Sequence, residues 1–155
     1  MTIETKLKEL GIEIPKISTP VANYIPAIIV GNELRTSGQI PMMDGELQFK
    51  GCVPSEQSVE NAVSAARLCG INAIAAAGAL LGGNLNRITR VTQLKVYVAS
   101  DIGFEGHSTI ANGASDLMVA VFGDAGRSIR VAMGAIGLPL GSTVEVEAIF
   151  EVRNT

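Results

Sequence analysis

The chain has 155 residues, of which 47% are hydrophobic and 17% are charged, and it carries a net charge of −3 with a pI of about 5.2. This length fits one domain with a sizeable core, but the charged fraction is below the ~25% of an ordinary globular protein. The acidic balance, the few aromatic residues and the absence of a basic cluster argue against a nucleic-acid surface, and one histidine with two unspaced cysteines argues against a metal site.

The N-terminal segment predicts a short amphipathic helix from Thr2 to Leu10, because Thr2 can cap it and Gly11 can end it. The segment mixes acidic residues with lysines and lacks the apolar core of a signal peptide, so we expect a cytoplasmic protein. No repeat, low-complexity tract or linker indicates a second domain. We therefore expect a single domain over residues 1–155, with residues 1 to about 14 as a helical extension.

Strands follow a proline-containing loop. The stretch AIIVGNELRTSGQI predicts two strands around the turn Gly31-Asn32, and residues Glu46 to Gly51 predict a third strand after the turn at Asp44-Gly45. We expect these three strands to form an antiparallel meander.

A long helix comes next, with Ser55 as its N-cap, an end near Leu81 and Gly82-Gly83 behind it. Its Ala-rich middle is apolar on nearly all sides, so the helix should be covered on more than one side. The longest weakly polar run, Gly70 to Gly83, is interrupted by Asn72 and is shorter than the ~20 residues of a membrane span. We therefore expect the apolar surplus of this chain to be buried between subunits and not in a membrane.

The C-terminal half adds a strand over Arg87 to Ala99, a helix over Ser108 to Phe122, and strands over Ile129 to Ile136 and Thr143 to Val152. The order βββαβαββ predicts an α+β fold with two helices on one face of a mixed sheet. The run Val131 to Ile136 is apolar or small at every position. We expect both faces of this strand to be buried, the second one by another subunit.

Arg130 stands at the head of this apolar run. Burying an unpaired guanidinium costs several kcal/mol, so the side chain must reach water or an anion. Its fork of donors matches a carboxylate, which makes it a candidate receptor for a small organic acid. If the last two strands form an antiparallel hairpin, Glu145 lies on the neighbouring strand, where its carboxylate could position a water or move a proton. The alternative is that Arg130 pairs with Glu145 or Glu147 across the sheet.

Three motifs, in this order, make the chain resemble the RidA family, also called YjgF. They are SGQIP at Ser37 to Pro41, an arginine followed eight residues later by Leu-Pro (Arg130 and Leu138-Pro139), and VEVEAI at Val144 to Ile149. The segment Asn112 to Gly123 is similar to the longer branch of that family. The resemblance implies a chorismate-mutase-like fold of the bacillar type and a homotrimer with ligand sites in the clefts between subunits.

The resemblance also implies a reaction, the hydrolysis of reactive enamine and imine acids such as 2-aminoacrylate and 2-iminopropanoate to 2-keto acids and ammonia, without a cofactor or metal. Arg130 matches the family arginine that holds the substrate carboxylate, and Glu145 matches the glutamate that handles the attacking water. Arg127 is not the match, because it lies eleven residues before Leu138 and not eight. The implied partners are a small carboxylate and further copies of this chain, with neither nucleic acid nor membrane.

Further residues of the implied cleft carry over by position. Tyr24, in NYIPA, corresponds to a cleft tyrosine, and the alternative for it is an interface aromatic. Gly38 and Gln39 match the backbone that lines the pocket. Asn112 lies within one residue of a cleft asparagine, and packing or capping within the helix is its alternative.

The chain departs from the family pattern at several positions. Val131 and Ala132 follow the arginine where small polar residues are usual, and Ile25-Pro26 replaces a Ser-Gln pair, so the expected pocket loses polar side chains. The alternative to an enzyme is therefore a non-catalytic trimeric protein that binds small carboxylate metabolites. An acidic chain gives little support to the endoribonuclease activity that is sometimes attached to the family. His107 is the other acid–base candidate, and we expect it to be an exposed loop residue.

Overall fold

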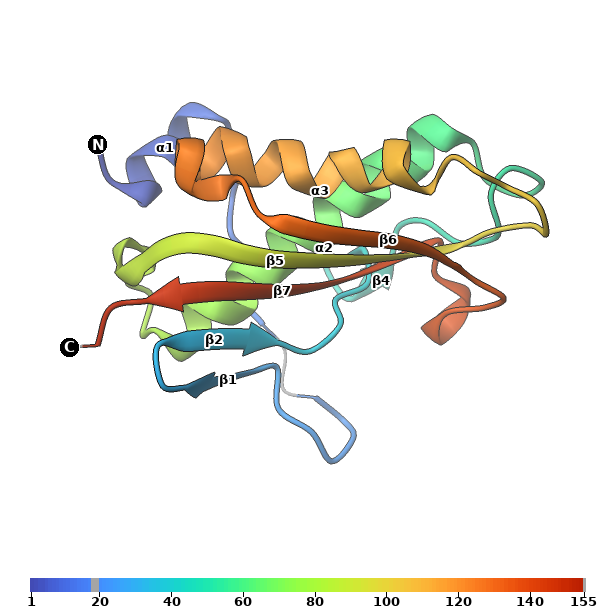
Figure 1. Ribbon diagram of the computed structural model, residues 1–155. Helices are drawn as coiled ribbons and strands as arrows, with labels where there is room; N and C mark the ends of the chain where they lie inside the picture. Colours follow the sequence, from blue (N-terminus) through green and yellow to red (C-terminus); the bar gives the residue numbers. More distant parts are fainter. Residues whose placement is uncertain (18–19, 155) are drawn as a thin grey trace.

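The computed structural model describes residues 1–17 and 20–154, and a five-stranded sheet with two long helices packed on one face dominates it (Figure 1). The strand order is β1-β2-β7-β5-β6. The elements are α1 (Ile3–Glu9), β1 (Ala27–Val30), β2 (Glu33–Thr36), α2 (Val59–Leu80), β5 (Ile88–Ala99), α3 (His107–Phe122), β6 (Ile129–Ala135) and β7 (Val144–Val152). Among the five strands of this sheet in the described residues, β5 and β6 pair in parallel and the other neighbours pair antiparallel, so the predicted mixed sheet of an α+β fold is confirmed.

The helix α1 forms where the sequence predicts it. Thr2 caps it, and the buried side chains of Leu7 and Ile12 join the main hydrophobic core. The backbone N–H of Ile3 donates to Oδ1 of Asn86 at 2.9 Å. The N-terminal segment therefore packs against the rest of the domain.

The predicted three-stranded meander is wrong at its third strand. The segment Glu46 to Gly51 contributes the short strand β4 (Glu46–Leu47), which pairs with β3 (Met42–Met43) in a separate two-stranded sheet, and an isolated bridge from Lys50 to Ser142. The second neighbour of β2 is β7, and this register places Leu34 opposite Phe150. Both side chains are fully buried. The strict alternation of apolar residues in β7 suits the position beside β2 in the sheet, which the more polar segment 46–51 cannot fill.

The predicted hairpin between the last two strands is also wrong, because β5 lies between them. β6 pairs in parallel with one edge of β5, and β7 pairs antiparallel with the other edge. The connection from β5 to β6 runs through α3, and a helical crossover of this kind returns the chain in the same direction. β6 is thus an edge strand, and Ile129 and Met133 remain 68% and 45% exposed on the face away from the helices. A single chain therefore leaves the outer face of β6 exposed.

The helix α2 begins at Val59 with Ser58 as its N-cap, so the predicted cap at Ser55 is wrong. The Ser58 Oγ accepts the backbone N–H of Asn61 at 3.1 Å. Ser55 is engaged elsewhere, because its Oγ and its backbone N–H donate to the two carboxylate oxygens of Asp101 at 2.9 and 3.0 Å.

The alanine variant of Ser58 is expected to lose about 1 kcal/mol of unfolding free energy, since removal of an N-cap costs ~0.5–2 kcal/mol. Hydrogen exchange of the Asn61 amide should become faster in Ser58→Ala and remain unchanged in Ser55→Ala. The reverse pattern in the two variants would contradict this assignment of the cap.

Most of α2 is buried between the sheet and α3. By length and composition alone it could cross a membrane, but 67% of its most apolar window is buried inside the protein, as in the central helix of a globular domain. Its polar interruption, Asn72, is buried, and the amide Nδ2 donates to the carbonyl oxygens of Ile40 and Met42 at 3.0 Å each. These bonds hold the segment that follows β2 against the helix.

Candidate functional site

The two predicted catalytic residues lie on opposite faces of the sheet. Arg130 is in register with Leu94, which is buried under the helices, whereas Glu145 is in register with Tyr97 on the other face. One chain therefore does not bring the guanidinium of Arg130 and the carboxylate of Glu145 together. The alternative in which Arg130 pairs with Glu145 or Glu147 is wrong for the same reason.

The first half of the candidate site, the arginine group, consists of Arg130 and Ala132 on β6 with Asn112 and Ser115 on α3. The Arg130 Nη1 donates to Asn112 Oδ1 at 2.7 Å and to Ser115 Oγ at 3.2 Å. Both acceptors are neutral, and among the described residues no Asp or Glu oxygen lies within 4.0 Å of the guanidinium. Its orientation is thus fixed while its charge stays uncompensated, which suits an incoming carboxylate.

The positions of the other members of the arginine group on α3 and β6 explain what each contributes. Asn112 lies inside α3, so it is not a cap, and its side chain positions the arginine. Ser115 was missed, although its spacing of three residues from Asn112 places both on one helix face. Ala132 is half-buried and shares the helix face of β6 with Arg130, where it offers no polar group.

The second half, the glutamate group, consists of Tyr24, Gly38, Gln39 and Glu145. The first three line a cavity of about 410 Å³. Gly38 lies against Glu145, because a Cβ at Gly38 would collide with the carboxylate of Glu145. The backbone N–H of Gln39 donates to the carbonyl of Val146 at 2.8 Å, and the Val146 N–H donates back at 2.9 Å. These two bonds hold the SGQIP segment beside the beginning of β7, next to Glu145.

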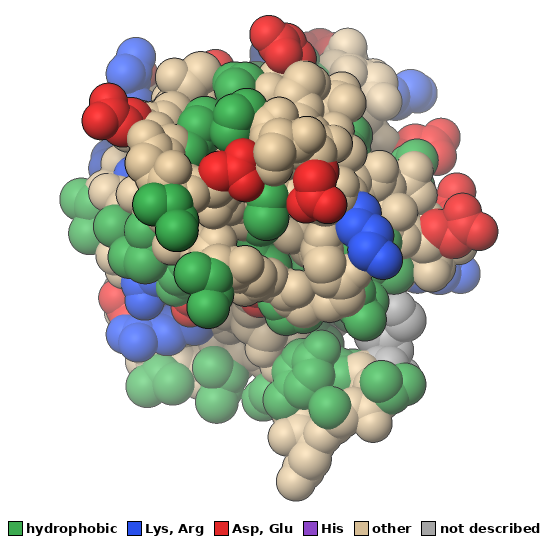
Figure 2. Space-filling view, turned by 90° about the vertical axis from the view of Figure 1, so that its right-hand side faces the viewer, with side chains coloured by type: hydrophobic (Ala, Val, Ile, Leu, Met, Phe, Trp, Pro, Cys, Tyr) green, Lys and Arg blue, Asp and Glu red, His purple; other side chains and the backbone are tan. Residues whose placement is uncertain are grey.

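The same cavity is partly formed by loops with exposed apolar side chains. Tyr24 and Leu140, which line it, are 56% and 69% exposed, and Ile25 and Ile136, outside the lining, are exposed as well. The hydroxyl of Ser37 donates to the carbonyl of Ile25 at 2.6 Å and ties the Tyr24 loop to the SGQIP segment. Figure 2 shows hydrophobic side chains gathered across one end of the molecule, with acidic side chains beside them. Such a surface is typical of a contact with another protein.

The charge environment distinguishes Glu145 from an ordinary surface carboxylate. Burial, and secondly the nearby charge of Glu147, raise the pKa of Glu145 above its usual value. Glu147 accepts a hydrogen bond from the Tyr97 hydroxyl, which, together with burial, raises the pKa of Tyr97 to about 12. A carboxyl group with a raised pKa exchanges a proton more readily near neutral pH, as acid–base chemistry requires.

Two other charged candidates lie outside both groups. The expectation that His107 is an exposed loop residue is wrong, because it is the first residue of α3 and is half-buried. Its Nε2 lies 3.0 Å from Ser100 Oγ, and its ring packs edge-on against Phe104. Arg127 forms an exposed ion pair with Asp124 at 3.4 Å. Within residues 1–17 and 20–154 no group of three or more His, Cys, Asp or Glu residues is placed to hold a metal ion, and the absence of a cofactor remains a prediction.

Comparisons with known proteins match nearly the whole chain. A family model described as "YjgF/chorismate mutase-like, putative endoribonuclease" matches residues 4–152. Protein TCP17 of Trypanosoma cruzi is 38% identical over 153 residues, which cover 98% of this chain and 95% of that protein. The structure of Atu1372 from Agrobacterium tumefaciens, described as a protein of unknown function, is 41% identical with a TM-score of 0.90 and covers 97% of this chain and 92% of its own. The structure of a "putative endoribonuclease" from Shewanella oneidensis is 34% identical with a TM-score of 0.93, and the match covers 98% of this chain and 100% of that protein.

Proposed function

This chain belongs to the YjgF/chorismate mutase-like family, and from that premise we propose that it hydrolyses small reactive enamine and imine acids to 2-keto acids and ammonia. The observation that carries the proposal is the guanidinium of Arg130, which neutral side chains orient and which no carboxylate of the described chain neutralises. A small 2-imino acid would supply the missing anion through paired hydrogen bonds. Its reactive C=N carbon is then held one bond away from the bound carboxylate.

The chemistry needs one water and no net redox change. Water adds to the imine carbon, and the resulting carbinolamine loses ammonia to leave the carbonyl group. In our proposal Glu145 accepts the proton of the attacking water and returns it to the departing nitrogen, for which its raised pKa is suited. Apolar neighbours such as Ala132 restrict the substrate to small side chains.

Because Arg130 and Glu145 lie on opposite faces of one sheet, we propose that each site is completed by two copies of the chain. The arginine group of one protomer would cover the glutamate group of the next. The exposed apolar residues on the outer sheet face, among them Ile28, Ile129 and Met133, provide a surface for this association. A closed homotrimer makes every such contact equivalent and completes three sites.

One observation favours a second candidate, a protein that binds small carboxylates without turnover. Ala132 and Val131 supply no polar side chain beside Arg130, and Asn112 and Ser115 already accept hydrogen bonds from its guanidinium, so few polar groups are left there to hold a water. We do not extend the proposal to RNA cleavage, because the chain is acidic and the arginine group offers a single cation.

The assay that tests the enzyme proposal couples this protein to a serine or threonine dehydratase and traps the released imine with semicarbazide. Wild-type protein is expected to lower the yield of trapped imine, and Arg130→Ala to lower kcat/KM about 10- to 100-fold, the equivalent of a lost charged hydrogen bond. Arg127→Ala is the matched control, since this arginine is exposed and lies outside both groups. If the wild type leaves the trapped yield unchanged, the enzyme proposal fails for these substrates, and calorimetric binding of 2-ketobutanoate would then favour the binding protein.

A further inference from the structure

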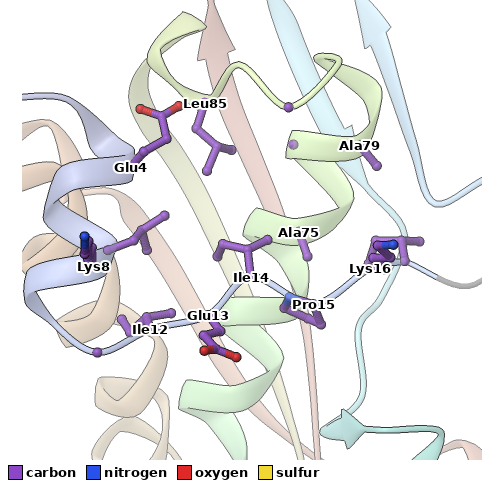
Figure 3. A pocket seen from close by; sticks show the side chains of 15 residues that line it. Glu4, Lys8, Ile12, Glu13, Ile14, Pro15, Lys16, Ala75, Ala79 and Leu85 are labelled. Carbon is purple, nitrogen blue, oxygen red and sulfur yellow. The ribbon is translucent and has the colours of Figure 1, made fainter.

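A larger cavity, of about 840 Å³, lies on the helical side of the molecule and takes no part in the proposed reaction (Figure 3). Its walls come from α1, from the segment 11–17, from the C-terminal half of α2 and from the short helix η1 (Leu85–Arg87). Ligand cavities in proteins commonly have volumes of ~300–1,000 Å³. The space is therefore large enough for a small molecule.

The lining of this cavity is mainly apolar. Figure 3 shows Ile14 and Leu85 pointing into the space between the N-terminal segment and α2, with Ala75 and Ala79 on the α2 side. The small residues of α2 leave room that larger side chains would fill. Transfer of an apolar group from water into such a space is favourable by about 25 cal/mol per Å² of surface removed from water.

The outer wall is held by side chains and not by a backbone ladder. Beyond the N–H of Ile12, which donates to the carbonyl of Leu7 at 2.9 Å, the backbone of residues 13–17 makes no hydrogen bond within the described parts of the chain. A wall of this kind can adjust to an occupant without breaking secondary structure. Side-chain burial of Ile14 and Ile17 keeps it in place.

The lining contains two lysines whose ammonium groups could each contact an anionic head group. Glu4 is already engaged, because its carboxylate accepts the Asn86 amide at 2.6 Å. The side-chain ammonium groups of Lys8 and Lys16, on opposite sides of the view in Figure 3, form no ion pair or hydrogen bond with any described residue, and Glu13 is the remaining carboxylate. The carboxylates of Glu4 and Glu13 balance the charge of the two lysines, but neither ammonium group has an ion-pair partner among the described residues, so both are available to an anionic head group.

We propose that this cavity binds an amphiphilic small molecule with an apolar body and an anionic head group, which one of the two lysines contacts. The proposal does not depend on imine hydrolysis, since it involves neither Arg130 nor Glu145. The cavity is separate from the one lined by Tyr24 and Gly38, although Pro15, Lys16 and Ile17 border both.

Two fluorescent probes that share one ring system test the proposal on the full-length protein. These are 8-anilinonaphthalene-1-sulfonate, which is anionic, and N-phenyl-1-naphthylamine, which lacks the sulfonate. We expect one anionic probe per chain and an affinity at least about tenfold above that of the neutral probe. Equal affinities would overturn the assignment of an anionic head group. Lys8→Gln and Lys16→Gln are expected to identify its contact, through a several-fold loss in one of the two variants.

Blocking the cavity provides the decisive variant. Ala79 is exposed and lines the cavity, so Ala79→Phe should fill part of it without disturbing the core and weaken the anionic probe at least about tenfold. Ser64→Phe is the matched control, because Ser64 is exposed on the same helix outside the cavity, and it should change the affinity less than about twofold. Unchanged binding in Ala79→Phe, with an unchanged melting temperature, would overturn the proposed site. Arg130→Ala should bind the probe like the wild type, which separates this result from the outcome of the imine assay.

Discussion

Gly113→Ala is expected to lower the free energy of unfolding by at least about 2 kcal/mol, although alanine is the better helix former by ~1 kcal/mol. Gly113 lies inside α3 where this helix crosses α2, and an added Cβ would collide with the backbone carbonyl of Val63. A backbone group cannot rotate away as a side chain can, so the two helices would have to separate. Thermal and denaturant unfolding at a fixed protein concentration measures the change.

Gly78→Ala is the matched control within a buried helix. The added Cβ there would meet only the Leu85 side chain, with Cδ2 at 3.1 Å, so the variant should be as stable as the wild type or up to ~1 kcal/mol more stable. Equal stabilities of Gly113→Ala and Gly78→Ala would contradict the close helix approach. The destabilised variant should also lose activity, because moving α3 displaces Asn112 and Ser115 from Arg130.

Local patterns were sufficient for most of the elements. The spacing of apolar residues in 88–99, 107–122 and 144–152 reflects which face of each element is buried. That face stays the same whichever strand lies beside the element. For this reason the helices and the long strands agree with their predictions within a few residues. The capping error at Ser55 has a different origin, since only the fold reveals that Asp101 occupies this side chain.

Strand pairing was the part that local patterns could not provide. Alternation in β7 predicts a half-buried strand but contains no information on whether β6 or β2 lies beside it. The long connection through α3 does contain such information, because parallel strands need a crossover of this length. Applied to β5 and β6, that rule would have favoured their parallel pairing.

The candidate site was predicted by residue type and position but not by its arrangement. Arg130 lies with Asn112, and Glu145 with Gly38, within one chain, and the resemblance to the family had named all four as expected site residues. Side-chain partners such as Ser115 follow from helix geometry only after the orientation of α3 toward β6 is known. In our proposal the two halves meet only when a second copy of the chain is present, and the periodicity of one chain contains no information on that contact.

Replacing Glu145 by glutamine is expected to lower kcat about 10²- to 10⁴-fold in the imine-trapping assay, the usual contribution of a general acid–base group. The same change should not destabilise the protein at neutral pH. Because the pKa of Glu145 is raised in the folded state, its ionised form costs stability above that pKa, and the cost disappears as the pH falls below it. Glu145→Gln removes this pH dependence, so lost activity with equal or higher stability is the expected combination. Unfolding of the variant at neutral pH would contradict it.

The proposal of a site shared between protomers makes a further quantitative prediction for the same variant. When Glu145→Gln and Arg130→Ala protomers are mixed by unfolding and refolding together, each site draws its arginine from one copy and its glutamate from the next. Random assembly of a closed homotrimer then places both intact residues at about one quarter of the sites, so roughly a quarter of the wild-type activity should return from two inactive proteins. A site built within one chain would regain nothing, because no single chain in the mixture carries both residues. Recovered activity therefore tests the oligomer and the roles of Arg130 and Glu145 together, and a mixture as inactive as its components would contradict the shared site.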